Sequence, residues 1–215
     1  MSYSFGKNYK VTLFGQSHSK EIGLVIDGIK AGYKINEDLI AKNLERRRPG
    51  RNEFSTTRKE KDLYQLVSGE VDGLTCGAPL CAIIKNKDQR SRDYENLKDK
   101  PRPSHADYPA FVKFCSHNDI RGGGQFSGRM TAPIVIGGSI AEDLLNQRGI
   151  KIYSRIKSIG QAKDDDILLE DIKEENFSDF KDQVFPVINP SSRERMKEEI
   201  LKAKKDGDSI GGVVE

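Results

Sequence analysis

Two histidines lie in segments where chemistry is common, because loops beside regular elements carry many catalytic groups. His18 belongs to the polar turn Gly15-Gln16-Ser17-His18-Ser19, and His105 follows the stiff segment Pro101-Arg102-Pro103. An imidazole with a pKa of about 6.5 can give or take a proton near neutral pH. Each residue could equally be an ordinary loop histidine. His117 lies outside these clusters and is expected to be a structural or surface residue.

Several arginines accompany the two histidines. Arg46-Arg47-Arg48 precedes Pro49-Gly50, Arg102 comes three residues before His105, and Arg129 closes a glycine-rich stretch. Guanidinium groups at one helix end can form a bidentate anion clamp. A structural role is the alternative, because arginines in the last turn of a helix also offset its dipole.

The glycine-rich stretch is Arg121-Gly122-Gly123-Gly124-Gln125-Phe126-Ser127-Gly128-Arg129. Glycines ahead of a helix let backbone amides approach an anion, and the helix N-terminus adds partial positive charge. The stretch is neither a P-loop nor a G-x-G-x-x-G motif, and a simple hinge is the alternative. No metal site is expected, because no histidine, cysteine and carboxylate cluster has ligand spacing.

Short regular elements must position these side chains. Strands are expected at Lys10–Phe14, Gly23–Ile26, Tyr64–Ser68, Pro79–Lys85 and Ile150–Ile159. A helix should begin after Asn36 as N-cap and stop at Arg48, because Pro49 follows. Tyr108–Ser116 is expected to be a short helix. The apolar segment after the glycines, out to Leu145, has apolar residues on every side, which favours a helix buried all round.

Two segments are expected to be charged and solvent-exposed. Asn86–Ser104 is expected to be a charged loop, and Gln161–Gln183 is acidic and suggests a surface excursion. Ser191–Lys205 is predicted to be an amphipathic helix with a Ser191/Glu194 capping box and an apolar side formed by Met196, Ile200 and Leu201. Gly211–Glu215 is how a strand begins. No internal repeat or domain boundary is evident, so residues 1–215 are expected to form one domain.

Composition narrows the class of protein. The 215 residues carry 36 Lys and Arg against 33 Asp and Glu, a net charge of +3, so anion binding must come from local clustering. No nucleic-acid partner is expected. Ala132–Ala141 is the longest apolar stretch, and a bilayer needs ~20 residues, so no membrane span is expected. Three cysteines, Cys76, Cys81 and Cys115, suggest buried free thiols and a cytoplasmic location.

The order of these motifs resembles the chorismate synthase family over nearly the whole chain. The resemblance rests on the following segments: Gly15-Gln16-Ser17-His18, Asp27-Gly28, Arg46-Arg47-Arg48-Pro49-Gly50, Thr57-Arg58-Lys59-Glu60-Lys61-Asp62, Asp88-Gln89-Arg90-Ser91-Arg92-Asp93-Tyr94, Arg102-Pro103-Ser104-His105-Ala106-Asp107-Tyr108, Arg121-Gly122-Gly123-Gly124 and Ser127-Gly128-Arg129.

The resemblance implies a fold and a reaction. The fold class is α+β, a β-α-β sandwich of the chorismate synthase type that is incomplete at the C-terminus. The reaction is an anti-1,4 elimination that converts 5-enolpyruvylshikimate-3-phosphate to chorismate and phosphate, so the enzyme class is a carbon–oxygen lyase. Such enzymes require reduced FMN and are cytoplasmic homotetramers. Whether this protein reduces its flavin with NADPH is not implied.

The resemblance also implies roles for single residues. Arg47, Arg102, Ser127 and Arg129 match substrate-binding positions, and His105 matches the candidate acid that protonates the departing phosphate. His18 matches a histidine beside the reduced flavin. Four positions match flavin contacts: Arg47, Gln125, Phe126 and Ser127.

Some residues depart from the family pattern. They are Gln16, Ser19, Glu53, Gln125, Phe126 and Met130, with Pro133 inside the following helix. Family members also continue well beyond this length, so 215 residues alone are expected to bind little FMN and to lack activity. The alternative function is a non-catalytic homologue that keeps the fold and has weakened flavin or anion binding.

Overall fold

The computed structural model describes residues 3–48, 62–86, 100–103, 105–168, 177, 180 and 183–215. They fall into two compact units. Unit 1 comprises Met1–Gly50 and Thr57–Arg148, and unit 2 comprises Arg51–Thr56 and Gly149–Glu215. Each unit is described by itself. The assignment of residues 1–215 to one domain stays a prediction.

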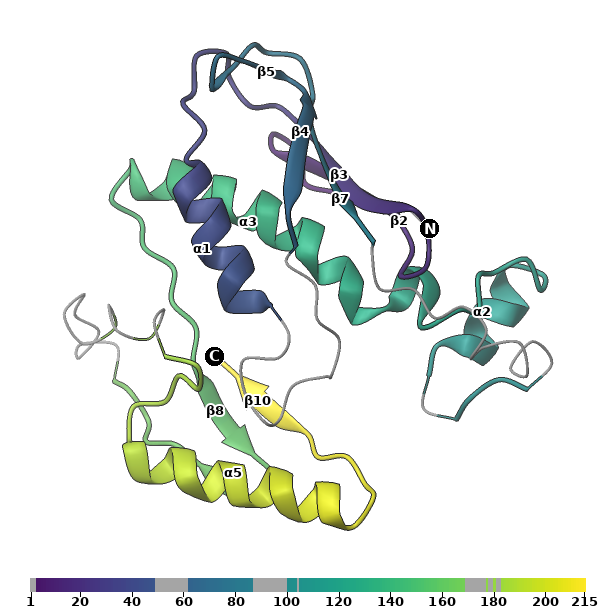
Figure 1. The fold of residues 1–215 in the computed structure, drawn as a ribbon. Coiled ribbons are helices and arrows are strands. Elements are labelled where there is room, and N and C mark those ends of the chain that lie inside the picture. Colours follow the sequence, from purple (N-terminus) through teal and green to yellow (C-terminus); the bar gives the residue numbers. More distant parts are fainter. Residues whose placement is uncertain are drawn as a thin grey trace. The chain divides into compact units, whose positions relative to one another are not determined.

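Unit 1 is built on a five-stranded antiparallel sheet (Figure 1). In spatial order its strands are β1 (Ser4–Phe5), β2 (Lys10–Gly15), β3 (Glu21–Asp27), β7 (Leu80–Lys85) and β4 (Tyr64–Ser68). A small hairpin, β5 (Glu70–Val71) and β6 (Leu74–Thr75), lies between β4 and β7 in the sequence. The predicted strands at 10–14, 23–26, 64–68 and 79–85 are therefore confirmed.

Alternation of apolar side chains fixes which face of this sheet is buried. In β3, Ile22, Leu24 and Ile26 are buried, and in β7 Leu80 and its period-two neighbours are buried as well. Leu24 lies opposite Ala82 in the antiparallel register. A period of two puts these side chains on one face, which a helix can then cover.

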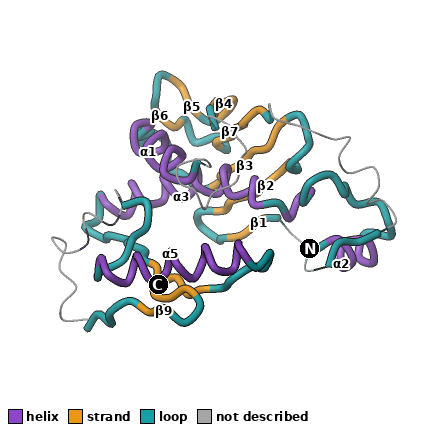
Figure 2. Tube along the Cα trace, turned by 60° about the horizontal axis from the view of Figure 1, so that its bottom comes forward, coloured by secondary structure: helices purple, strands orange, loops and turns teal. Residues whose placement is uncertain are grey.

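The covering helix is α3 (Thr131–Asn146), and α1 (Glu37–Arg47) packs against it (Figures 1 and 2). Ile136 and Ile140 are buried, whereas Ile134 is 41% exposed. The expectation of a helix buried all round is therefore wrong for unit 1. Pro133 is the third residue of α3, where a backbone N–H has no partner within the helix, so it fits without disrupting the first turn.

The other helix ends of unit 1 largely follow the sequence. Asn36 caps α1, because its Oδ1 accepts a hydrogen bond from the backbone N–H of Leu39 at 3.1 Å. The helix ends at Arg47, with Arg48 as C-cap, as predicted. Helix α2 spans Asp107–Lys113, shorter than the predicted 108–116.

Unit 2 is a three-stranded antiparallel sheet covered by one helix. The strand order is β10 (Gly212–Val214), β8 (Ile156–Ile159) and β9 (Ala162–Lys163), and α5 (Pro190–Lys205) packs on β8 and β9. Met196 is fully buried and makes the core together with Ala162 and Val187. The predicted C-terminal strand and the amphipathic helix are confirmed.

Four expectations for unit 2 are wrong. Residues 150–155 are not part of β8, and the segment 161–183 is not only a surface excursion, because it supplies β9 and the buried Phe177 and Phe180. Asn189 rather than Ser191 caps α5, and its side chain accepts from the Ser191 N–H at 3.0 Å. Leu201 is 43% exposed and lies outside the buried stripe.

The cysteines are free, as expected, but only Cys81 is partly buried, and Cys76 and Cys115 are exposed. Among the described residues, no helix combines the length and apolar character needed to cross a membrane. The segments Arg51–Lys61 and 87–99, together with Ser104, lie outside the described residues.

Candidate functional site

The turn that carries His18 joins β2 to β3. Gly15 has φ +95°, and the Ser19 hydroxyl closes the turn by accepting from the Gln16 N–H at 2.9 Å. His18 is buried, and its Nδ1 lies 3.0 Å from Ser17 Oγ. The Ser17 hydroxyl donates to the Arg121 carbonyl, also at 3.0 Å. Because a hydroxyl has one proton, Nδ1 is the donor to Ser17, and Nε2 is then the basic nitrogen of the neutral ring.

The glycine run packs directly against this turn. The Ser17 N–H donates to the Gly124 carbonyl at 3.0 Å. Gly122 has φ +63°, and a Cβ on it would lie 2.6 Å from Ser17 Oγ and 2.7 Å from His18 Cε1. Only glycine permits both this conformation and this approach. The run therefore seats the His18 ring.

Asp119 lies next to the contact between the His18 turn and the glycine run, where it is bonded to Arg121. Burial raises the pKa of Asp119, but the hydrogen bonds from Arg121 and the electrostatic interaction with nearby His18 lower it by a larger amount. The pKa of Asp119 therefore lies below its ordinary value. Asp119 stays ionised and holds Arg121 through two hydrogen bonds of 2.8 Å.

Arg102 ties the His105 segment to the glycine run. Its Nε and Nη2 donate to the two carboxylate oxygens of Asp107 at 2.7 and 3.0 Å, and Nη2 also donates to the Gly122 carbonyl. The Arg102 hydrogen bond is the largest cause that lowers the pKa of Asp107. His105 is exposed on this segment. In this structure the guanidinium expected to bind substrate is therefore already paired within the chain.

Arg47 and Arg129 meet on one carboxylate. Arg47 Nη1 donates to Asp62 Oδ2 at 2.9 Å, and Arg129 Nη1 donates to Asp62 Oδ1. The Asp62 side chain is fully buried, Arg129 is 5% exposed, and Arg47 comes from the last turn of α1. Asp62 thus brings two of the predicted guanidiniums together.

Asn86 connects this pair to the His18 turn. Its Oδ1 accepts from Arg129 Nε at 3.0 Å, and its Nδ2 donates to the carbonyls of Gln16 and Ser19 at 3.1 and 2.8 Å. Ser127 joins from the other side, because its Oγ accepts from the Arg129 N–H at 3.2 Å and caps the short 3₁₀ helix η3 (Gly128–Met130).

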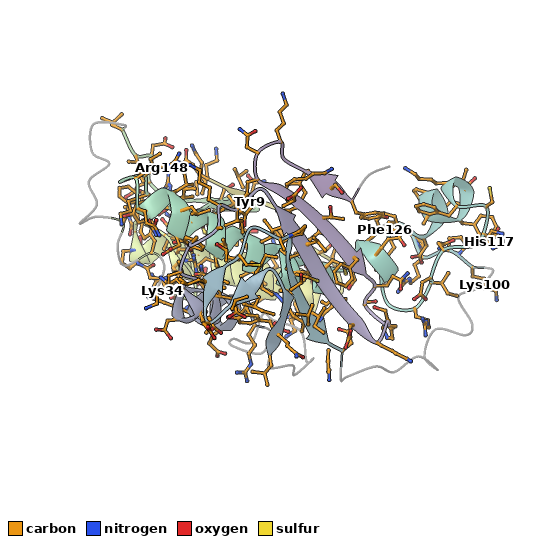
Figure 3. The ribbon with its side chains drawn as sticks, turned by 90° about the horizontal axis from the view of Figure 1, so that it is seen from above. Tyr9, Lys34, Lys100, His117, Phe126 and Arg148 are labelled. Carbon is orange, nitrogen blue, oxygen red and sulfur yellow. The ribbon has the colours of Figure 1, made fainter. Side chains whose placement is uncertain are left out.

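Gln125 and Phe126 lie on the preceding 3₁₀ helix, η2 (Gly124–Phe126). Gln125 is half-buried, whereas Phe126 is 44% exposed, with its ring centroid 6.5 Å from that of Phe114. Figure 3 shows Phe126 beside the α2 segment and His117, which is exposed, at the far side of that segment. Phe126 offers an accessible aromatic face near Ser127.

The structure thus gathers most of the predicted residues into one network. His18, Arg47, Ser127 and Arg129 are linked through Asp62 and Asn86, and the segment with Arg102 and His105 is attached through Gly122. Sequence reasoning missed four residues of this network: Asp62, Asn86, Asp107 and Asp119. Asn86 had a usable signal, since a polar amide directly after an apolar strand often marks a site. Glu53 lies outside the described residues.

The chemistry available follows from charge and burial. Arg47, Arg129 and Asp62 bring two guanidinium groups and one carboxylate together in a largely buried place. Such a cluster favours an anionic ligand, because opposite charges interact strongly where water is scarce. Two imidazoles on adjoining segments can supply proton transfer.

Two pockets in the described part of unit 2 are lined by none of these residues. One, of about 690 Å³, lies between the end of α5 and the strands β8 and β10. The other, of about 340 Å³, is lined by Tyr153, Phe177 and Phe180 with Arg155.

Comparison with known proteins agrees with the sequence motifs. The family model described as chorismate synthase matches residues 9–215. Chorismate synthases of Pyrococcus abyssi and Methanocaldococcus jannaschii are 44% and 41% identical over 213 and 220 residues, covering 98% and 99% of this chain but 57% and 58% of their own length. A solved structure titled "Crystal Structure of Chorismate Synthase" has a TM-score of 0.69 at 26% identity, covering 97% of this chain and 57% of its own. The chain therefore spans less than two thirds of these relatives.

Proposed function

The chain belongs to the chorismate synthase family, and we propose that its residues serve the elimination of phosphate from 5-enolpyruvylshikimate-3-phosphate to give chorismate. The observation that carries the proposal is the pairing of Arg129 and Arg47 on buried Asp62, joined by Asn86 to the His18 turn. The reaction breaks one C–O bond to phosphate and one ring C–H bond, and forms a carbon–carbon double bond. The products besides chorismate are phosphate and the proton from the C–H bond, and no net oxidation occurs. Because a C–O bond is cleaved by elimination, the class is a carbon–oxygen lyase.

The charges of the substrate match those of the site. It carries a phosphate and two carboxylates, and the Arg47–Asp62–Arg129 cluster supplies two guanidinium groups. Arg47 and Arg129 bind and orient this anion, and Ser127 lies next to Arg129 in the same 3₁₀ turn. Arg102 holds the His105 segment against Gly122 and adds a further guanidinium at that edge.

Proton transfer falls to the two histidines. His105 is exposed on a segment tied to the site, so it can reach a departing phosphate and protonate it. His18 is buried, with Nδ1 directed to Ser17, and its Nε2 is the nitrogen available to hold a proton near a neighbouring anion.

The residues also suit reduced FMN, the cofactor that the family implies. Phe126 offers an exposed aromatic face, Ser127 and Gln125 offer polar atoms, and buried His18 becomes a donor for an anionic ring when its Nε2 is protonated. When bound, the reduced flavin supplies electron density to the elimination. Gln125, Phe126, Ser127 and Arg47 would hold it. We also propose a cytoplasmic, homotetrameric protein.

An anaerobic assay with reduced FMN and 5-enolpyruvylshikimate-3-phosphate, followed by chorismate absorbance, tests the proposal. It is run on the 215-residue chain and on a chimera that joins these residues to the part of the Pyrococcus abyssi enzyme outside the match. Turnover by the chimera is expected. A chimera that is inactive while the intact relative is active would favour the non-catalytic alternative, which the comparisons do not favour. NADPH in place of chemical reductant tests flavin self-reduction.

His105→Ala in the chimera should slow turnover by about 100-fold, because a general acid contributes on that order. His117→Ala is the matched control, since His117 is exposed and outside the network. Equal turnover of the two variants would remove His105 from the mechanism.

A further inference from the structure

Two residues without an assigned role hold the guanidinium of Arg129 from both ends. Asp62 accepts a hydrogen bond from its Nη1, and Asn86 accepts one from its Nε at 3.0 Å. Neither partner is free to move. The Asp62 side chain is fully buried, and Asn86 is held by its backbone N–H to the Lys20 carbonyl at 3.0 Å as well as by its Nδ2 contacts.

The types of these two partners matter as much as their positions. A carboxylate at position 86 would place a second negative charge beside Arg129, whereas the neutral Asn86 amide orients Arg129 without adding charge. Asp62 holds both arginines, because each of its two carboxylate oxygens accepts a hydrogen bond from one of them, Oδ2 from Arg47 and Oδ1 from Arg129. A fixed fork geometry binds anions with less entropy lost than a mobile side chain.

We propose that Asp62 and Asn86 are positioning residues: Asp62 sets the spacing of Arg47 and Arg129, and Asn86 fixes Arg129 to the His18 turn. The anionic substrate then meets two guanidinium groups that are already held in position. The inference rests on the proposed function, because the anion to be held is the substrate named there.

The direct test is the solvent exchange of the Arg129 Nε–H, measured by ¹⁵N NMR on the 215-residue chain. In the unaltered protein this proton should exchange slowly, and in Asn86→Ala it should exchange about 10-fold faster, as expected when a charge-assisted hydrogen bond is lost. Asn43→Ala is the matched control, because Asn43 donates two comparable hydrogen bonds, to Ser139 and Glu142, elsewhere in unit 1. Equal exchange of Arg129 in all three proteins would overturn the proposal.

The second readout is the dissociation constant of 5-enolpyruvylshikimate-3-phosphate. Asn86→Ala and Asp62→Asn should each raise it by about 10-fold, because Asp62→Asn leaves one acceptor oxygen for two guanidiniums. Asn43→Ala and Asp143→Asn should leave it unchanged, since Asp143 is bonded to Tyr33 and Asn36 instead. Circular dichroism shows whether the two site variants fold. If they do not, the dissociation constant is measured on Asn86→Ser instead.

The two proposals fail in different ways. If the unaltered chain and the chimera both fail to bind the substrate, the proposed function is wrong, and the positioning roles are decided by Arg129 exchange alone. If substrate binds but Asn86→Ala changes neither Arg129 exchange nor affinity, the positioning roles are wrong and the proposed function stands.

Discussion

Replacing Gly122 by alanine should disturb both unit 1 and the His18 ring. Gly122 has φ +63°, and its Cβ would lie 2.6 Å from Ser17 Oγ and 2.7 Å from His18 Cε1. An alanine in the left-handed region costs about 1–2 kcal/mol. Forcing a methyl group into an occupied place costs about 1–3 kcal/mol more. We therefore expect Gly122→Ala to lower the free energy of unfolding of unit 1 by about 2–5 kcal/mol.

Two other glycines separate these costs. Gly32 has φ +82° with nothing within 4 Å of its Cβ position, so Gly32→Ala should show only the conformational cost of about 1–2 kcal/mol. Gly128 has neither a positive φ nor a close neighbour, so Gly128→Ala should be within about 0.5 kcal/mol of the unaltered protein.

The assay is urea denaturation followed through amide signals of β2 and β3, which belong to unit 1. His18 ring resonances should also shift in Gly122→Ala and not in Gly32→Ala. If Gly122→Ala unfolds at the same urea concentration as Gly32→Ala, with an unchanged His18 spectrum, the reasoning about the Gly122 contact is refuted.

Three further predictions concern other contacts. Because Arg102 lowers the pKa of Asp107, the pair stabilises the fold above the unfolded pKa of about 3.9 and loses that contribution as the pH falls toward the folded value. In Asp107→Asn the free energy of unfolding should fall less steeply between about pH 5 and 3 than in the unaltered protein. The same slope in both proteins would contradict this. Asp164→Asn should cost unit 2 about 3 kcal/mol in urea denaturation, since Arg155 would lose a buried partner, and a loss under about 1 kcal/mol would be contrary. Asn189→Ala should cost about 1 kcal/mol, and a neutral result would deny the capping role.

The elements that sequence predicted well were those with local causes. The short apolar segments Gly23–Ile26 and Pro79–Lys85 located β3 and β7, and Asn36 with Pro49 bounded α1, because strand composition and helix ends depend on neighbouring residues. The Ser191 cap was wrong because Asn189 competes two residues earlier, followed by Pro190 at the first helical position. Local rules could not rank the two caps.

The errors of burial had a different origin. Ile134 is apolar but 41% exposed, and Phe177 is buried inside a segment that looked like a polar excursion. Burial is decided by which elements pack on which face, and this information is not local. Composition along a segment therefore predicts its average polarity better than the position of a single side chain.

The residue types of the candidate site could be predicted from the sequence, but most of the hydrogen bonds that connect them could not. The family resemblance supplied His18, Arg47 and Arg129, but their links run through Asp62 and Asn86, which lie 67 and 43 residues from Arg129 in sequence. Hydrogen bonds across such separations depend on the fold. Arg102 shows the converse, since a residue expected to face the substrate is bonded to Asp107 five residues away.

A crystal structure of the chain grown with 5-enolpyruvylshikimate-3-phosphate tests the central claim most directly. The account predicts phosphate or carboxylate oxygens within hydrogen-bond distance of Arg47 and Arg129, with His18 lining the same pocket. Substrate bound elsewhere, with none of its oxygens within hydrogen-bond distance of Arg47 or Arg129, would contradict it.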